Sequence, residues 1–360
     1  NPWQDYANSV TCPDGTIASG WHLRNSNKPS RVADEHSETA FITDRAMDFI
    51  REQRDHPWCL HLSYIKPHWP YIASAPYHQL FHPDDCLPAH RLEEERINPH
   101  PVYQAFMNNE VSKTFSRDEV RTTVVPTYMG LIKQIDDHLG RLFSFLKTEN
   151  HMTDTMIVFT SDHGDYLGDH FLGEKELFHD CAARLPLILY DPDTSADATR
   201  GTVNDTLIES IDLLPTFLES CHLDQVDHIL EGESLMPLVR GNKVRRHHDD
   251  VFSELDYAYY DTRRQLNLEP SEARSYMIRT KDWKYIYHRH FRPQLFDLKN
   301  DPGEFVDLGG ETSRVSVLKE LADRMFLRLL QLKSRVTESD STVDARTDVV
   351  EDRGIFIGRW

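Results

Sequence analysis

The residues best suited to chemistry follow an apolar segment near the middle of the chain. Residues 156–159 are Met, Ile, Val and Phe, and the segment that they begin runs into Asp162 and His163. A polar stretch with glycines then leads to Lys175. Buried strands commonly deliver reactive side chains into the loop that follows them. A carboxylate beside an imidazole suits a divalent metal ion, and a nearby ammonium group suits an anionic substrate.

Asp162 and His163 can be interpreted in two ways. Consecutive side chains on a strand point to opposite faces, but a turn at the strand's end can direct both to one ion. A carboxylate with a neutral imidazole favours Mn²⁺, Zn²⁺ or Fe²⁺ over Ca²⁺, which takes oxygen ligands. The alternative is an aspartate that caps a helix beside an incidental histidine, and the motif alone does not decide between the two. Two ligands are also fewer than such metal sites need.

Lys175 and His68 are the other two candidates. Lys175 can hold the non-bridging oxygens of a phosphoryl or sulfuryl group, although a solvated surface lysine is the ordinary alternative. His68 stands between Pro67 and Pro70 at the end of another predicted strand, where open α/β sheets bind ligands. An imidazole held there can donate a proton to a leaving oxygen, and the simpler alternative is a packed or surface histidine.

Taken together, these clusters resemble the sulfatase branch of the alkaline phosphatase superfamily. The resemblance covers nearly the whole chain and rests on residues 66–70, 162–170 with Lys175, 184–188, 211–216 and 295–304. His163 stands where many members of the branch have Asn. That difference, together with residues 73–78 and the apolar end at residues 354–360, is most similar to the phosphonate monoester hydrolases.

The resemblance implies a role for each candidate residue. Asp162 and His163 would bind one divalent metal ion, with Mn²⁺ expected and Zn²⁺, Fe²⁺ or Ca²⁺ as alternatives. Lys175 would bind the oxygens of the substrate, and His68 would assist the leaving group or position the substrate. The implied substrate is a small anionic ester: a phosphonate or phosphate monoester or diester, with a sulfate ester, as in an arylsulfatase, as the alternative.

One essential part of the family pattern is absent from the sequence. The family's nucleophile is a cysteine in a Cys-x-Pro-Ser-Arg segment that is converted to formylglycine, and none of the cysteines stands in such a segment. Residues 27–31 match Pro-Ser-Arg but have Asn where the cysteine is needed. We therefore expect that the chain lacks the N-terminal part of its parent protein and is inactive alone. The alternative, from another class, is a non-catalytic protein that kept the fold.

The hydrophobic pattern predicts the elements that position these residues. It predicts helices over residues 37–54, 116–146, 207–221 and 315–332, and strands over residues 58–65, 156–161, 185–190, 276–287 and 295–298. Pro126 is expected to kink or restart the second helix. The alternation of strands and helices predicts an α/β fold, and the resemblance makes it alkaline-phosphatase-like, with a mostly parallel sheet sandwiched by helices.

A change of pattern near residue 245 predicts a second part of the chain. Residues 1–244 are expected to form the major part of the α/β core, without its first strand and nucleophile segment. Residues 245–335 are expected to form a smaller C-terminal subdomain with an antiparallel β-sheet and a helix. Residues 336–360 are expected to be a tail whose apolar end contacts a neighbouring subunit, so we predict a homo-oligomer.

Composition excludes several classes of partner. The chain has 360 residues, with 40 basic and 59 acidic side chains and a net charge of −19. This excess of acid disfavours binding to nucleic acid or to an anionic membrane surface. No stretch approaches the roughly 20 apolar residues of a membrane span. The five cysteines are dispersed, which fits reduced thiols, so we expect a cytoplasmic protein.

Overall fold

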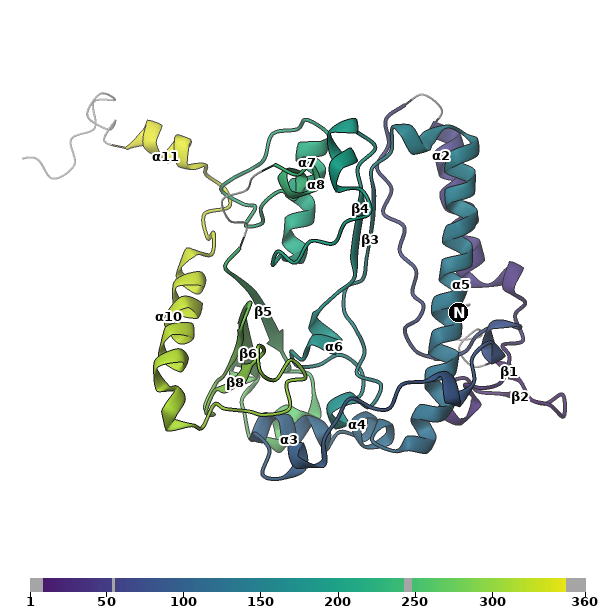
Figure 1. The fold of residues 1–360 in the computed structure, drawn as a ribbon, viewed down its shortest axis with the longest axis horizontal. Helices are drawn as coiled ribbons and strands as arrows, with labels where there is room; N and C mark the ends of the chain where they lie inside the picture. Colours follow the sequence, from purple (N-terminus) through teal and green to yellow (C-terminus); the bar gives the residue numbers. More distant parts are fainter. Residues whose placement is uncertain (1–8, 54–55, 243–247, 348–360) are drawn as a thin grey trace, which may run out of the picture. The chain divides into compact units, whose positions relative to one another are not determined.

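The computed structural model describes residues 9–53, 56–242 and 248–347 (Figure 1). The chain divides into two compact units, residues 1–192 and 193–360. The domain limits expected after residues 244 and 335 stay predictions. The apolar segment 354–360, on which the predicted oligomer contact depends, lies outside the described residues.

The first unit is built along one long helix. Helix α5 spans Asp118–Thr148 and continues through Pro126, so the predicted restart at this proline does not occur. Helix α2, Glu38–Gln53, packs against α5 (Figure 1). Their apolar faces meet in a cluster that includes Ile50, Leu142 and Phe145. Both helices were predicted from apolar spacing, and burial of that apolar stripe is the reason that they pack together.

The rest of the first unit consists of short elements. They are β1 (Val10–Thr11), β2 (Ile17–Ala18), α3 (Pro101–Met107), α4 (Glu110–Phe115), β3 (Ile157–Thr160), α6 (Asp180–Ala183) and β4 (Leu187–Tyr190). Strands β1 and β2 pair in an antiparallel ladder. Long irregular segments therefore carry much of this unit, including the segments that hold the candidate residues.

Strands β3 and β4 pair in antiparallel orientation, with Ile157 opposite Tyr190 and Thr160 opposite Leu187. A mostly parallel sheet was expected, and this pair of strands departs from that expectation. Parallel neighbours need a crossover, usually a helix, that returns the chain to the same end of the sheet. Residues 161–186 contain only a 3-10 turn and the four-residue helix α6, so the chain enters β4 from the end at which it left β3.

The predicted strand over residues 58–65 forms no ladder with another strand in the part of the chain that is described. Its residues nevertheless alternate between half-buried and exposed, as in an extended segment. Trp58, Leu60 and Leu62 pack against the α2–α5 cluster. Residues 58–65, predicted as a strand, therefore form an extended segment with one half-buried face.

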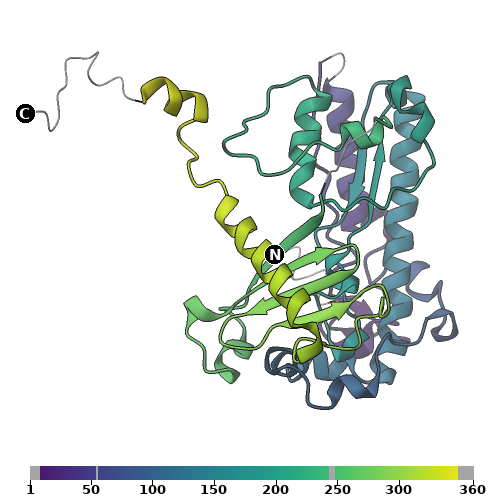
Figure 2. The ribbon, with the colours of Figure 1, turned by 60° about the vertical axis from the view of Figure 1, so that its left-hand side comes forward.

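The second unit contains a four-stranded antiparallel sheet covered by a helix. The strands are β5 (Asp250–Asp256), β6 (Arg274–Thr280), β7 (Trp283–His288) and β8 (Gln294–Asp297), paired in that order. Helix α10, Val315–Gln331, lies across the sheet (Figure 2). Its Leu321 and Met325 pack against Ile278, Tyr285 and Leu295. The predicted antiparallel sheet plus helix is confirmed.

The remaining helices of the second unit are short. They are α7 (Leu213–Ser220), α8 (Met236–Val239), α9 (Asp261–Gln265) and α11 (Asp340–Arg346). Helix α7 is shorter than the predicted segment 207–221, because a 3-10 turn over Ser210–Asp212 precedes it. Among the helices described in both units, none has the length and apolar composition needed to cross a membrane.

Candidate functional site

The first unit brings the four predicted site residues close to one another. Lys175 Nζ lies 3.4 Å from His68 Nε2, although 107 residues separate the two in the sequence. The rings of His68 and His163 meet edge to face, with centroids 6.2 Å apart. His163 Nε2 in turn lies 3.7 Å from Asp162 Oδ2. Two polar segments that are far apart in the chain thus converge in a single cluster.

The backbone sets the tautomer of His163. Its Nδ1 lies 2.7 Å from the carbonyl oxygen of Gly164. A carbonyl can only accept, so Nδ1 carries the hydrogen, and Nε2 of the neutral ring offers a lone pair. Metal-binding histidines have this arrangement, in which a carbonyl holds the second ring nitrogen. The neighbouring Asp162 side chain is 89% exposed, so its carboxylate is accessible to a cation.

Gly164 allows this turn after β3 to lie close to another segment. Its N–H donates to the carbonyl oxygen of Ala182 at 2.9 Å. A Cβ atom at this position would collide with the backbone carbonyl of Cys181. The glycine that follows Asp162 and His163 is therefore required by the close approach of two backbones.

His68 is held in the same tautomer by its own loop. Nδ1 donates to the carbonyl oxygen of Trp69 at 2.7 Å, which leaves Nε2 of the neutral ring to accept from the Lys175 ammonium. The buried Lys66, at the start of this loop, donates to the carbonyl oxygen of Pro70 at 3.0 Å. Burial lowers the pKa of Lys66 to about 8, and the nearby Glu38 carboxylate partly opposes this shift.

An aromatic wall adjoins His68. The ring of Trp69 stacks on the imidazole with centroids 5.3 Å apart. Trp21, from an N-terminal loop, meets Trp69 edge to face at 4.8 Å and is 40% exposed. The buried Nε1 of Trp69 has no hydrogen-bond partner among the described atoms. Trp69 and Trp21 thus give the cluster an apolar surface in addition to its charged residues, Lys175 and Asp162.

Two carboxylates near the cluster were missed by the sequence analysis. Asp165 accepts a 2.7 Å hydrogen bond from the buried Tyr71 hydroxyl. Burial raises the pKa of Asp165 to about 6, with the Tyr71 bond opposing the shift. Burial, together with the nearby Glu176 charge, also raises the pKa of Glu174. In the sequence, only position pointed to the pair of Asp165 and Tyr71. Asp165 follows His163 by two residues, and Tyr71 follows the histidine loop.

The donors present fit a divalent metal ion in type but not in number. Asp162 and His163 offer one carboxylate and one imidazole, a combination that suits Mn²⁺, Zn²⁺ or Fe²⁺. Within the described ranges, no group of three or more His, Cys, Asp or Glu residues is arranged to hold a metal ion. These two residues can therefore supply only part of a coordination shell.

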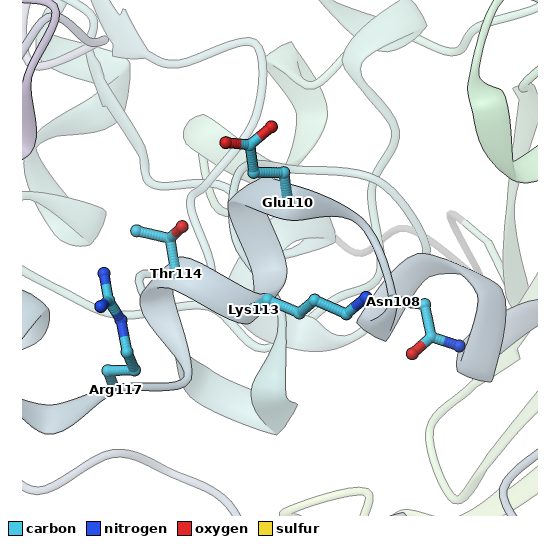
Figure 3. Close-up of a pocket in the computed structure, with 5 residues that line it drawn as sticks. All are labelled: Asn108, Glu110, Lys113, Thr114 and Arg117. Carbon is cyan, nitrogen blue, oxygen red and sulfur yellow. The ribbon is translucent and has the colours of Figure 1, made fainter.

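A separate polar hollow lies on helix α4 (Figure 3). It is lined by Asn108, Glu110, Lys113, Thr114 and Arg117. None of the four predicted site residues contributes to it, and the charged residues that line it are exposed. Exposed side chains of both signs around an open hollow provide no reactive group with a controlled environment, so we assign it no function.

Comparison with known proteins identifies the family. The sulfatase family model matches residues 4–222. A second model, for the C-terminal part of N-sulphoglucosamine sulphohydrolase, matches residues 168–331. Because the first match covers more than half of the chain, the chain belongs to the sulfatase family. The resemblance to the sulfatase branch of the alkaline phosphatase superfamily is confirmed, as is the fold class that it implied.

Individual relatives refine this picture. The chain is 31% identical over 333 residues to the multifunctional alkaline phosphatase superfamily protein PehA of Trinickia caryophylli, which covers 88% of the chain and 63% of that protein. A phosphonate monoester hydrolase structure from Silicibacter pomeroyi superposes with a TM-score of 0.83 at 28% identity, covering 93% of this chain and 67% of that one. The corresponding Agrobacterium radiobacter structure gives 0.78 at 25% identity, covering 88% and 66%.

These relatives are longer than the chain. The chain spans about 63% of the length of PehA and 53% of an arylsulfatase from Clostridium perfringens, to which it is 26% identical over 283 residues and 75% of its own length. The family and its fold therefore apply to this chain directly. The activity of the whole protein is a separate question.

Proposed function

We propose that the parent protein of this chain is a metal-dependent hydrolase of phosphonate or phosphate esters. The observation that carries the proposal is the 3.4 Å contact between Lys175 Nζ and His68 Nε2, with His163 beside them. A cation and an imidazole that share one location can bind an anion and transfer a proton to its leaving group. Sulfate esters, as in an arylsulfatase, are the alternative substrates.

Lys175 and His68 would act in succession. The oxyanion of a bound ester would draw the Lys175 ammonium from the imidazole and accept its hydrogen bonds, which strengthen as negative charge develops. His68 would enter the reaction protonated, with Nδ1–H held by the Trp69 carbonyl and Nε2–H directed toward the leaving oxygen. As the oxygen nucleophile, discussed below, bonds to phosphorus and the bond to the leaving oxygen breaks, the Nε2 proton would move to the leaving oxygen, and His68 would become neutral.

Asp162 and His163 would hold the metal ion, with Mn²⁺ expected and Zn²⁺, Fe²⁺ or Ca²⁺ as alternatives. A divalent cation in such a site supplies positive charge that activates an oxygen nucleophile and neutralises developing negative charge. The lone pair on Nε2 of His163 and the exposed carboxylate of Asp162 support this assignment. The other ligands would belong to a part of the parent protein outside residues 1–360.

The nucleophile would also lie outside this chain. The family uses formylglycine made from cysteine, and Cys12, Cys59, Cys86, Cys181 and Cys221 all lack the Cys-x-Pro-Ser-Arg context. We therefore expect residues 1–360 alone to be inactive toward phosphonate, phosphate and sulfate esters. Turnover by the purified chain that tracks the protein through chromatography would contradict this part of the proposal.

The aromatic wall supports a leaving group of a particular kind. Trp69 stacks on the histidine that would protonate the leaving oxygen, so the organic group on that oxygen would lie within reach of the two indoles. The Lys175 ammonium beside His68 disfavours a cationic group there. We propose an uncharged, apolar alcohol, such as a phenol, as the leaving group.

The deciding experiment uses the full-length parent protein and three substrates with the same leaving group. These are 4-nitrophenyl phenylphosphonate, bis(4-nitrophenyl) phosphate and 4-nitrophenyl sulfate. We expect kcat/KM to be highest for the phosphonate or the phosphodiester, and a preference for the sulfate would favour the arylsulfatase alternative. Absence of turnover with all three, in a protein that binds Mn²⁺ and carries formylglycine, would contradict the hydrolase proposal and favour a non-catalytic protein.

A further inference from the structure

A buried acid–base pair, Glu95 and His170, anchors the loop that connects Asp162 to Lys175. We call residues 162–175 the site loop, because it begins at Asp162 and ends at Lys175. His170, in the middle of this loop, has its Nδ1 2.6 Å from Glu95 Oε1. The two side chains are only 2% and 3% exposed, so solvent does not screen their interaction. The proposed reaction uses neither of them.

The Glu95 carboxylate is fully engaged. It belongs to the 3-10 helix Glu93–Arg96. Its second oxygen, Oε2, accepts from the Leu92 amide at 2.8 Å. The Tyr103 hydroxyl lies 3.1 Å from Glu95 Oε1 and 2.5 Å from the carbonyl oxygen of His170. Glu95 and Tyr103 therefore hold both the ring and the backbone of His170.

The contacts continue from His170 to the end of the site loop. The ring of His170 stacks on that of His179, with centroids 4.1 Å apart and planes 21° apart. His179 Nδ1 lies 2.9 Å from the Tyr166 hydroxyl, and the Tyr166 amide donates to the carbonyl oxygen of Glu174 at 2.8 Å. Glu174 precedes Lys175. The chain of contacts thus joins Glu95 to the residue next to the Lys175 cation.

The site loop needs external support because its backbone is strained. Leu167, His170 and Phe171 have φ angles of 45°, 50° and 58°, in the left-handed region that side chains disfavour. Such conformations persist only where surrounding contacts determine them. One such contact comes from His90, whose carbonyl accepts from the His170 amide at 2.9 Å. Another comes from helix α5, where Arg121 Nε donates to the Leu167 carbonyl at 2.7 Å.

We propose that Glu95 is a positioning residue for the reaction. By holding His170, it keeps the site loop in the conformation that puts Lys175 beside His68. The expected effect on kcat rests on the proposed function, whereas the expected effect on the conformation of the site loop does not. It differs from a purely stabilising role, in which loss of the Glu95 charge would lower the free energy of unfolding and leave the loop of the folded protein unchanged.

The test compares Glu95→Gln with Glu304→Gln. Glu304 also has a buried carboxylate, 2.5 Å from Lys284, and it lies in the second unit. Each variant removes one buried negative charge, so both are expected to lower the thermal unfolding midpoint. In the full-length parent, Glu95→Gln should lower kcat about 10- to 100-fold, because the Lys175 ammonium is displaced from the transition state. KM should change less than about threefold. Glu304→Gln should leave both constants within about twofold of wild type, the scale of an uninvolved residue.

Amide hydrogen exchange on residues 1–360 supplies a readout that needs no activity. Under conditions where both variants stay folded, Glu95→Gln should speed exchange at Tyr166 and Leu172, whose amides donate within the site loop, by at least about tenfold. Exchange in helix α2 should not change. Unchanged exchange in the site loop would overturn the proposal, as would equal acceleration by Glu304→Gln. If the wild-type parent proves inactive while the exchange result holds, the proposed function fails and the anchoring role of Glu95 stands.

Discussion

Lys175 Nζ and His68 Nε2 lie 3.4 Å apart, at the ends of two segments that are 107 residues apart in the sequence. The histidine ring is oriented by the Trp69 carbonyl, so its lone pair faces the ammonium group. This relationship joins the proline-bracketed loop to the loop after β3. It also places a cation and an imidazole side by side in one cluster.

Removal of the Lys175 cation should impair the chemical step of the parent enzyme. We expect Lys175→Ala to lower kcat/KM for 4-nitrophenyl phenylphosphonate about 100- to 1,000-fold, as for loss of one stabilising donor at a developing oxyanion. Lys113→Ala, which removes an exposed lysine of helix α4, is the matched control and should behave as wild type. Steady-state kinetics of the two variants tests the role of Lys175, and an equal, small effect of both would exclude it.

Metal affinity should depend on the ring nitrogen of His163. We expect His163→Ala to weaken Mn²⁺ binding by the parent protein at least about tenfold in isothermal titration calorimetry, and Asp162→Ala to do the same. His82→Ala, which removes a largely exposed imidazole, should leave the affinity unchanged. Chelation of the metal should abolish activity in the wild type, and readdition of Mn²⁺ should restore it. Unaltered Mn²⁺ affinity in both site variants would rule out these ligands.

Trp21 should matter for aromatic leaving groups. Loss of its exposed indole by Trp21→Ala removes about 1 kcal/mol of aromatic contact, which corresponds to a rise in KM of roughly fivefold for a phenyl ester. A methyl ester of the same acid cannot make this contact, so its kinetic constants should change little. Parallel assays of the phenyl and methyl esters provide the comparison. A proportional loss for both esters would show that Trp21 supports the fold and does not contact the leaving group.

The buried Lys66 makes a specific contribution to stability at alkaline pH. Burial lowers its pKa to about 8 in the folded chain, below the ordinary value of 10.5. Between these values the unfolded chain binds the proton that the folded chain has lost, so the free energy of unfolding rises with pH. The slope from this residue is about 1.4 kcal/mol per pH unit over that window, and the residue adds no slope below pH 7.

Urea denaturation of residues 1–360 at several pH values between 7 and 10 measures this slope. We expect Lys66→Met to lose it, while Lys147→Met, at an exposed position in the last turn of α5, should keep it. The difference between the two variants removes the contribution of other groups that titrate in this range. Identical pH profiles for both variants would show that Lys66 keeps an ordinary pKa in the folded chain.

Local patterns predicted the helices and the covered sheet well. Helices α2, α5 and α10 follow from apolar spacing, because each buries one stripe of its surface. Strands β6, β7 and β8 follow from their β-branched and aromatic residues, whereas β5, Asp250–Asp256, was not predicted. The orientation of β3 against β4 was not predictable in this way. It depends on how residues 161–186 return the chain to the sheet, and no local pattern encodes that path.

Residue types and their spacing were enough to identify the candidate reactive groups and the family: the order Asp162-His163-Gly164, the lysine that follows and the histidine loop. These features are local, and they depend on residue types and spacing. The contacts of Lys175 with His68, of Tyr71 with Asp165 and of Glu95 with His170 became visible only in the folded chain. Each of these contacts joins residues that are distant in the chain, and each is specified by burial and packing of the intervening segments, which local propensities do not specify.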